Sequence, residues 1–189
     1  GVYYKHDYGA GVDISRYRNI PVPTSYMAYR SEYDFVGGYD ECAEAGVLHI
    51  ADHHVSPGKK QWTWGCGDFG QAWDRNLTDQ NGPYIELMTG MFTDNQPDFS
   101  WLKPFEEKTF TQVFMPYKKV RHVGNASTKL VLGLQVADGR AELGVYATSV
   151  RENAKVALTA CGRTVFERTL RLSPEEVLCE TVDVGSCAP

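Results

Sequence analysis

The stretch KLVLGLQVADGRAELGVYA, residues 129–147, decides the fold class of this chain. Two apolar runs, 129–136 and 141–147, flank the pair Asp138-Gly139. An Asp-Gly pair between apolar runs is typical of a tight β-hairpin, because both central positions of such a turn need a positive φ. The stretch therefore predicts two antiparallel strands joined by a short turn.

The rest of the C-terminal part repeats this pattern. Strand-like runs at 154–159, 164–170 and 177–184 are separated by Cys161-Gly162 and by Ser173-Pro174. Gly, Ser and Pro at these places favour turns. Several antiparallel strands at such spacing are typical of a small immunoglobulin-like β-sandwich. We interpret this part as a spacer or packing module, because a fold alone carries no activity.

Composition divides the chain into two modules. All four Trp, all five His and most of the Phe and Tyr lie within residues 1–122. The segment 118–125 is polar and basic, as a linker would be. We place the boundary at residue 122, which gives one module at 1–122 and a second at 123–189.

The first module also has the pattern of a β-protein. Loops rich in Gly, Asp, Asn and Pro separate its apolar runs and supply turn conformations. A short helical turn is expected at 69–75. The predicted fold class is therefore all-β in both modules, with strands of the first expected at 25–30, 46–51, 61–64, 84–88 and 108–115.

Charge and hydropathy exclude two classes of partner. The net charge is −5 and the 19 Lys and Arg are scattered, so no basic stripe is available for a phosphate backbone and no nucleic acid is expected. The chain has no run of about 18 apolar residues, so no membrane span is expected. It begins on Gly1 without Met or an apolar leader, which suggests a fragment of a longer polypeptide with further domains.

The cysteines suggest a reducing environment. Their number, five, is odd, and no C-x-x-C pair occurs. We therefore expect reduced thiols rather than a disulfide framework. Together with the absence of a signal peptide, this favours a cytoplasmic location. We expect no cofactor.

The segment HIADHH, residues 49–54, is the first candidate for chemistry. On an extended strand, His49, Ala51 and His53 would share one face, and Asp52 and His54 would share the other. Two neighbouring His and an Asp could bind a metal ion, but this spacing matches no standard site, so we expect no metal.

Two tryptophans follow on the next predicted strand. Trp62 and Trp64 alternate with Thr63 and so share a face. Paired indole rings form a flat platform for the apolar face of a sugar ring, but large aromatic side chains also dominate protein cores. Both interpretations stay open from the sequence.

A carboxylate in an apolar setting is the third candidate. Glu86 lies among Tyr84, Ile85 and Leu87. A carboxylate there is costly unless it is paired or functional, although alternation along a strand would also let it face water. The many Asp, Asn and Gln of 76–98 offer both donors and acceptors to sugar hydroxyls.

Around Glu86 the chain resembles a known family. Tyr84-Ile85-Glu86, the following run to Phe99, Leu102-Lys103-Pro104 and a strand at 109–114 resemble the C-terminal part of aldose 1-epimerases, the galactose mutarotases. Residues 1 to about 120 more closely resemble a bacterial family of unknown function in the galactose-mutarotase-like superfamily, whose members often carry tetratricopeptide repeats. The segments that carry the closer match are 19–23, 51–54, 60–65, 72–74 and 82–87.

The resemblance implies a fold and a chemistry. The fold is a β-supersandwich, here its C-terminal portion, followed by the small immunoglobulin-like sandwich. Mutarotases use a Glu as general base on the anomeric hydroxyl and a His as general acid on the ring oxygen. Glu86 matches that Glu by position. The acid of the family lies in an upstream segment that this chain does not contain, so His53 or His54 would have to replace it.

We therefore predict carbohydrate recognition, with a carbohydrate as the ligand. The predicted catalytic residues are Glu86, His53 and His54. Two alternatives stay open. One is an epimerase or a glycoside hydrolase, which would need a second carboxylate about 5–10 Å from Glu86. The other is a structural or adaptor module. The predicted substrate-binding residues are Asn19, Trp62, Trp64, Trp73, Asp74 and Tyr84.

Overall fold

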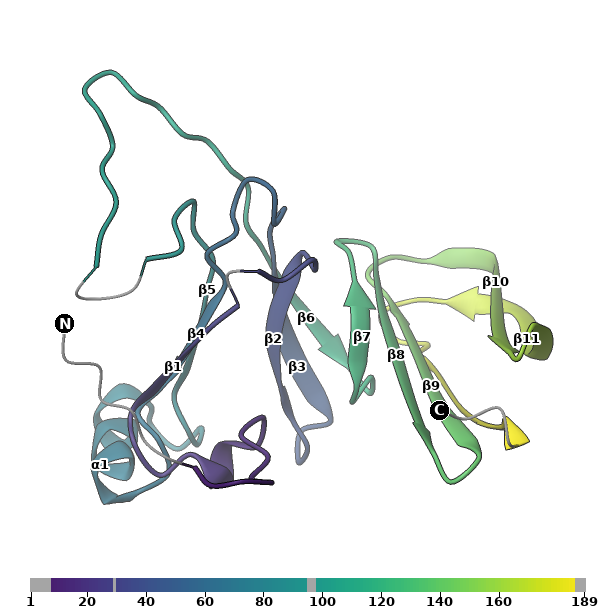
Figure 1. The fold of residues 1–189 in the computed structure, drawn as a ribbon. Coiled ribbons are helices and arrows are strands. Elements are labelled where there is room, and N and C mark those ends of the chain that lie inside the picture. Colours follow the sequence, from purple (N-terminus) through teal and green to yellow (C-terminus); the bar gives the residue numbers. More distant parts are fainter. Residues whose placement is uncertain (1–7, 29, 95–97, 186–189) are drawn as a thin grey trace. The chain divides into compact units, whose positions relative to one another are not determined.

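The structure is a computed structural model that describes residues 8–28, 30–94 and 98–185. Within these residues it consists almost entirely of antiparallel strands, with one α-helix and one short 3-10 helix (Figure 1). The all-β prediction is confirmed. The chain divides into two compact units, Gly1–Glu32 with Ala51–Thr111, and Tyr33–Ile50 with Gln112–Pro189.

The first unit contains a three-stranded sheet of order β1-β4-β5. Its helix α1 follows β4 and precedes β5, and the 3-10 helix η1 precedes β1. The bounds are η1 Tyr17–Asn19, β1 Thr24–Met27, β4 Lys60–Thr63, α1 Asp68–Leu77 and β5 Ile85–Met88.

Helix α1 is held closely against the loop that leaves β4. Asp68 in the first turn and Arg75 in the last turn both complement the helix dipole. Gly70 faces the loop so closely that a Cβ there would lie 1.7 Å from the carbonyl oxygen of Gly65. Glycine at this position therefore lets the helix lie against the end of the sheet.

The second unit contains two sheets and a long hairpin. The sheets have the orders β2-β3-β6 and β12-β9-β8-β7, and the hairpin is β10-β11. The bounds are β2 Phe35–Asp40, β3 Ala45–Ile50, β6 Val113–Lys118, β7 Val123–Ala126, β8 Leu130–Ala137, β9 Arg140–Ala147, β10 Arg151–Ala160, β11 Arg163–Leu172 and β12 Leu178–Asp183.

Two apolar clusters form the core of this unit. One joins β3 and β6 to β8 and β9, and its buried residues include Leu48, Tyr117, Val131 and Tyr146. The other lies under the β10-β11 hairpin and includes Val145 and Leu172. Burial of these aliphatic and aromatic side chains supplies the main driving force for packing the strands.

The turn residues behave as their sequence predicts. Asp138 and Gly139 both have positive φ, 49° and 72°, between β8 and β9. Cys161 and Gly162 do the same between β10 and β11, at 47° and 73°. The five strands expected in 129–184 all form.

Four sequence-based expectations differ from the structure. The strand expected at 25–30 ends at Met27, as β1. The strand expected at 108–115 begins at Val113, and 108–112 have no regular structure. Strand β2 was not expected, because Gly37 and Gly38 interrupt its apolar alternation. Strand β7 lies in the segment expected to be a linker, where it pairs with β8. Residue 29 of the expected strand 25–30, and residues 95–97 of the family-like motif, lie outside the described residues.

The expectation of reduced thiols holds in part. Cys42, Cys66 and Cys179 are free. The expectation is wrong for Cys161, which is disulfide-bonded. Among the described residues, no helix is long and apolar enough to cross a membrane.

Candidate functional site: an aromatic and acidic face of the first unit

Trp62 and Glu86 are direct partners across the β4-β5 pair. Ser25 is the partner of Trp62 on the other side, in β1. Residues directly opposite in antiparallel strands project to the same face. Ser25, Trp62 and Glu86 therefore form a row across one face of the sheet, and both Trp62 and Glu86 are half-buried.

Four aromatic rings gather at the α1 end of this face. The rings of Trp64 and Trp73 are stacked, with centroids 4.4 Å apart and an angle of 10° between their planes. Trp62 meets Trp64 edge-on at 5.3 Å. Phe69 lies 5.9 Å from Trp64 and 6.4 Å from Trp73. We call these four residues the tryptophan cluster.

The tryptophan cluster is open to solvent on its helical side. Phe69 is 58% exposed and Trp73 is 37% exposed, whereas Trp64 is half-buried. Among the described residues, the buried Nε1–H of Trp64 has no hydrogen-bond partner. An unpaired buried donor carries a desolvation cost, so this indole N–H is a polar group that the described residues leave unsatisfied.

Asp74 joins three segments of the first unit. Its Oδ1 accepts a hydrogen bond from the backbone N–H of Tyr84 at 3.0 Å, and its Oδ2 accepts one from the hydroxyl of Tyr17 at 3.2 Å. The same hydroxyl lies 2.8 Å from the carbonyl oxygen of Gly65. Burial and the neighbouring Asp74 carboxylate raise the pKa of Tyr17 to about 12. Asp74 therefore has a structural role beside its predicted binding role.

Asn19 lies on the η1 segment, which is tied to the loop after β4. The backbone N–H of Cys66 donates to the carbonyl oxygen of Ile20 at 2.7 Å. The Nδ2 of Asn19 donates to the carbonyl oxygen of Asp13 at 2.7 Å. This side chain is thus held within its own loop.

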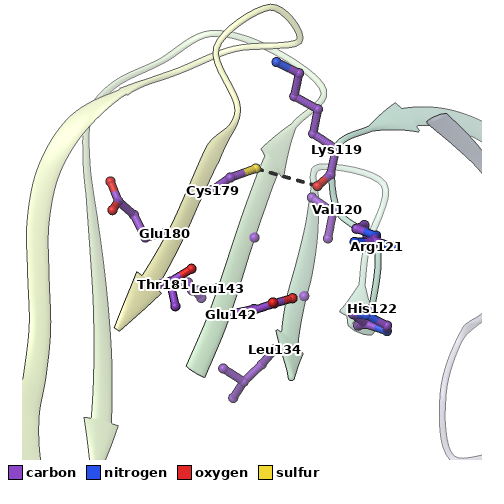
Figure 2. Close-up of a pocket in the computed structure, with 12 residues that line it drawn as sticks. Lys119, Val120, Arg121, His122, Leu134, Glu142, Leu143, Cys179, Glu180 and Thr181 are labelled. Atoms are coloured by element: carbon purple, nitrogen blue, oxygen red, sulfur yellow. Dashed lines mark hydrogen bonds between the residues drawn. The ribbon is translucent and has the colours of Figure 1, made fainter. Parts of the chain in front are cut away.

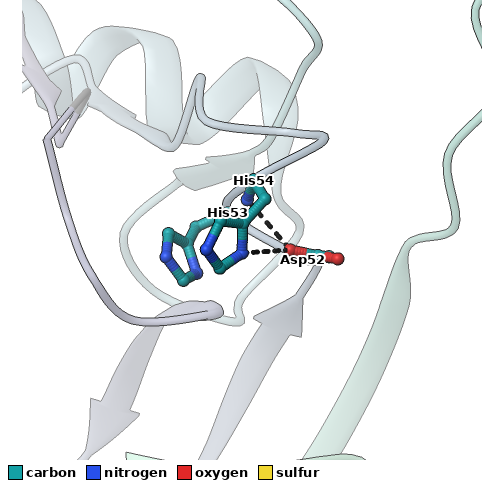
Figure 3. A group of neighbouring side chains, drawn as sticks. All are labelled: Asp52, His53 and His54. Atoms are coloured by element: carbon teal, nitrogen blue, oxygen red, sulfur yellow. Dashed lines mark hydrogen bonds and ion pairs between the residues drawn. The ribbon is translucent and has the colours of Figure 1, made fainter.

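His53 and His54 lie on a turn and not on a strand. Asp52 Oδ1 accepts hydrogen bonds from the backbone N–H of His54 at 2.9 Å and contacts its Nδ1 at 3.0 Å (Figure 3). This local bonding competes with extension, as is common for Asp. The expected separation of His53 and His54 onto opposite faces is therefore wrong, since their ring centroids are 3.8 Å apart.

His49, which was expected to share a face with His53, is buried within the second unit. It is 1% exposed, and its Nε2 lies 2.9 Å from Oε1 of Gln112. Its ring stacks on Phe114 at 4.2 Å. His49 is thus a packed core residue.

The structure brings together some of the predicted site residues. Trp62, Trp64 and Trp73 meet, and Glu86 stands beside Trp62. His53 and His54 lie on the turn that precedes Lys60, the first residue of β4. Trp64 follows Thr63, the last residue of β4, so the histidines and Trp64 lie beyond opposite ends of this strand. Phe69 was missed, although it lies four residues before Trp73, a spacing that puts both side chains on one side of a helix.

The second unit has a separate small pocket of about 190 Å³. Val120 lies against β8 and β9 there, close enough that a Cβ on Gly133 would come within 2.6 Å of its side chain. The Sγ of Cys179 donates to the carbonyl oxygen of Lys119 at 3.6 Å (Figure 2), and burial raises the pKa of the Cys179 thiol. This pocket contains none of the predicted site residues.

Comparison with known proteins finds two matching family models and a solved structure. The model described as a domain of unknown function (DUF5107) matches residues 5–125, and the model described as YphG-like protein, second domain, matches residues 125–189. A crystal structure of a TPR-domain containing protein from Parabacteroides distasonis ATCC 8503 is 22% identical, with a TM-score of 0.38. That match covers 55% of this chain and 15% of the other, so this chain spans a small part of that protein's length.

Proposed function

The chain belongs to the DUF5107 family of domains of unknown function, and for this member we propose that the first unit recognises carbohydrate. The single observation that carries the proposal is the position of Glu86 directly opposite Trp62, beside the tryptophan cluster. A sugar offers an apolar face of C–H groups and a rim of hydroxyls. An indole beside a carboxylate is suited to both, since the ring covers the apolar face and the carboxylate accepts from hydroxyls.

In this proposal the sugar binds against the exposed side of the tryptophan cluster. Trp73 and Phe69 are open to solvent, and the stacked pair of Trp64 and Trp73 holds the helix residue rigid. Because few rotatable bonds have to be fixed, such a platform loses little conformational entropy on binding.

We further propose that this unit is a portion of a galactose-mutarotase-like β-sandwich that binds without catalysing. Ring opening needs a proton acceptor and a proton donor within hydrogen-bond reach of the sugar. Glu86 supplies the first. His53 and His54 precede the opposite end of β4 from the stacked tryptophans, which disfavours them as the donor. We therefore favour sugar binding over epimerase or hydrolase chemistry, because binding needs Glu86 and the tryptophan cluster but no proton donor.

An adaptor role is the second candidate, and a specific loop favours it. Phe99, Trp101 and Phe105 are exposed by 69%, 78% and 106% on the connection that follows β5. The rings of Phe99 and Trp101 meet edge-on with centroids 5.3 Å apart, and contiguous exposed apolar patches often mark protein interaction sites. A protein partner that binds through this loop would leave the tryptophan cluster unused.

Calorimetric titration of the full chain with a panel of mono- and oligosaccharides tests the proposal. We expect saturable binding of at least one sugar, weakened about tenfold or more by Trp62→Ala and by Glu86→Gln, which corresponds to about 1.4 kcal/mol per tenfold. Trp101→Ala and Glu107→Gln are matched controls from exposed positions of the same unit. Equal loss of sugar binding in the two controls, or unchanged binding in Trp62→Ala and Glu86→Gln, would refute the proposed site. An absence of saturable binding to every sugar of the panel would favour the adaptor role.

A further inference from the structure

Three consecutive side chains on the turn before β4 converge. Asp52, His53 and His54 each offer one metal-ligating atom, and these atoms all lie within 4.8 Å of one another (Figure 3). The ring centroids of the two histidines lie 3.8 Å apart, with the ring planes tilted by 40°. An extended strand would send alternate side chains to opposite faces, so it is the turn that brings them together.

The backbone of this turn is fixed by local hydrogen bonds. The carbonyl oxygen of Asp52 accepts from the N–H of Val55 at 3.2 Å and from the N–H of Ser56 at 2.7 Å. Its Oδ1 accepts from the N–H of His54. The Asp52 side chain is thus bound to the turn through one oxygen, while its charge remains directed at the imidazole of His54.

The chain beyond the turn is anchored in the unit. Ser56 is fully buried, and the N–H of Gly58 donates to the carbonyl oxygen of Gly90 at 2.9 Å. A Cβ on Gly58 would lie 1.9 Å from the carbonyl oxygen of Phe92, so this close approach requires glycine. These contacts fix the backbone that follows the turn to the rest of the unit.

We propose that Asp52, His53 and His54 bind one divalent transition-metal ion of the Zn²⁺ class. Two imidazole nitrogens and one carboxylate oxygen are a set that Zn²⁺, Co²⁺ and Ni²⁺ accept, with remaining positions left for water. Ca²⁺ and Mg²⁺ require mainly oxygen ligands, of which this turn supplies one side chain. The ligand set therefore selects a borderline transition metal over the hard cations.

The exposure of the side chains and the carboxylate of Asp52 are both consistent with metal binding. The side chains of His54 and Asp52 are 76% and 60% exposed, so an ion can reach them without a conformational change. Between Nδ1 of His54 and Oδ1 of Asp52, 3.0 Å apart, the ion would replace a proton.

This metal site does not depend on carbohydrate recognition. None of its three residues belongs to the tryptophan cluster. The turn precedes the first residue of β4, Lys60, whereas Trp64 follows the last one, Thr63. A failure to bind metal would leave the sugar proposal untouched, and a failure to bind sugar would leave the metal site untouched.

The test is calorimetric titration of the untagged full chain with ZnCl₂, repeated with CoCl₂ and with CaCl₂. We expect one Zn²⁺ per chain, similar binding of Co²⁺, and no saturable binding of Ca²⁺. His54→Ala and His53→Ala should each weaken Zn²⁺ binding more than tenfold, since even the loss of an outer-shell partner costs about 10–100-fold. His122→Ala, in the second unit, is the control and should bind as the wild type does.

Asp52→Asn separates the metal role from the structural one. Its side-chain oxygen can still accept from the N–H of His54, so the turn and the melting temperature without metal should be unchanged, while Zn²⁺ affinity falls more than tenfold. Circular dichroism of each variant verifies the fold. An absence of saturable Zn²⁺ binding in the wild type, or wild-type affinity in His54→Ala and Asp52→Asn, would overturn the proposal.

Discussion

Trp64, just after β4, and Trp73, on α1, stack with their ring planes 10° from parallel. This stack joins the helix to the end of the sheet. The helix can approach so closely because Gly70 has no Cβ, which would otherwise clash with the carbonyl oxygen of Gly65. The rings that we propose as a sugar platform therefore also hold the first unit together. Loss of one ring should affect stability as well as binding, and the two effects have to be measured separately.

Trp73→Ala should lower the free energy of unfolding by about 2 kcal/mol. This is below the usual range for a buried Trp because the ring is 37% exposed. Trp101→Ala, at 78% exposure, should change it by less than about 0.5 kcal/mol. Urea unfolding monitored by circular dichroism gives both values. Equal effects of the two variants would mean that the stack does not stabilise the helix.

Asp74→Asn should lower the pKa of Tyr17 from its value of about 12. Burial is the larger cause of the raised pKa and remains in the variant, so the pKa should stay above the ordinary value of tyrosine. The amide oxygen can still accept from the N–H of Tyr84, which keeps the connection to β5. NMR titration of ring-labelled tyrosine, assigned with Tyr17→Phe, measures the shift, and an unchanged pKa would show that the carboxylate does not influence the hydroxyl.

Stability of the second unit should fall between about pH 10 and pH 12. Burial raises the pKa of Tyr117 to about 12, with a smaller contribution from Tyr39. The folded state then holds its proton where the unfolded state has lost it, so the contribution is complete below pH 10 and disappears as the pH rises through 12. Tyr117→Phe should flatten this decline in urea midpoints measured from pH 9 to pH 11, whereas Tyr33→Phe should not.

Local patterns could be predicted from the sequence because neighbouring residues determine them. The Asp138-Gly139 turn has the positive φ values that its residues favour, and Trp62 and Trp64 share a face because side chains alternate along an extended chain. The opposition of Trp62 and Glu86 could not be predicted. It depends on the register of β4 with β5, which are joined by a helix and two loops rather than by a tight turn.

The turn at residues 52–54 could not be predicted for a related reason. The pattern of 49–54 permits a strand, but the carboxylate of Asp52 bonds to the backbone of His54 and ends the strand at Ile50. Asp competes with regular structure in this way at many chain ends. Sequence alone gives no rule for when that competition succeeds, so the convergence of Asp52, His53 and His54 required coordinates.

Gly46→Ala should destabilise the second unit by about 1–3 kcal/mol, as overpacking of a core does. Gly46 pairs with Tyr39 on one side and with Tyr117 on the other, and a Cβ there would lie 2.4 Å from the carbonyl oxygen of Gly38 and 2.6 Å from the Tyr117 ring. Gly38→Ala is the matched control from the paired strand, because nothing lies within 4 Å of its Cβ position and its φ is not positive. Thermal unfolding of both variants checks the prediction. Since the two rings lie 5.9 Å apart across Gly46, only a glycine lets them cover the strand between them, and equal stability of the two variants would refute this tight packing.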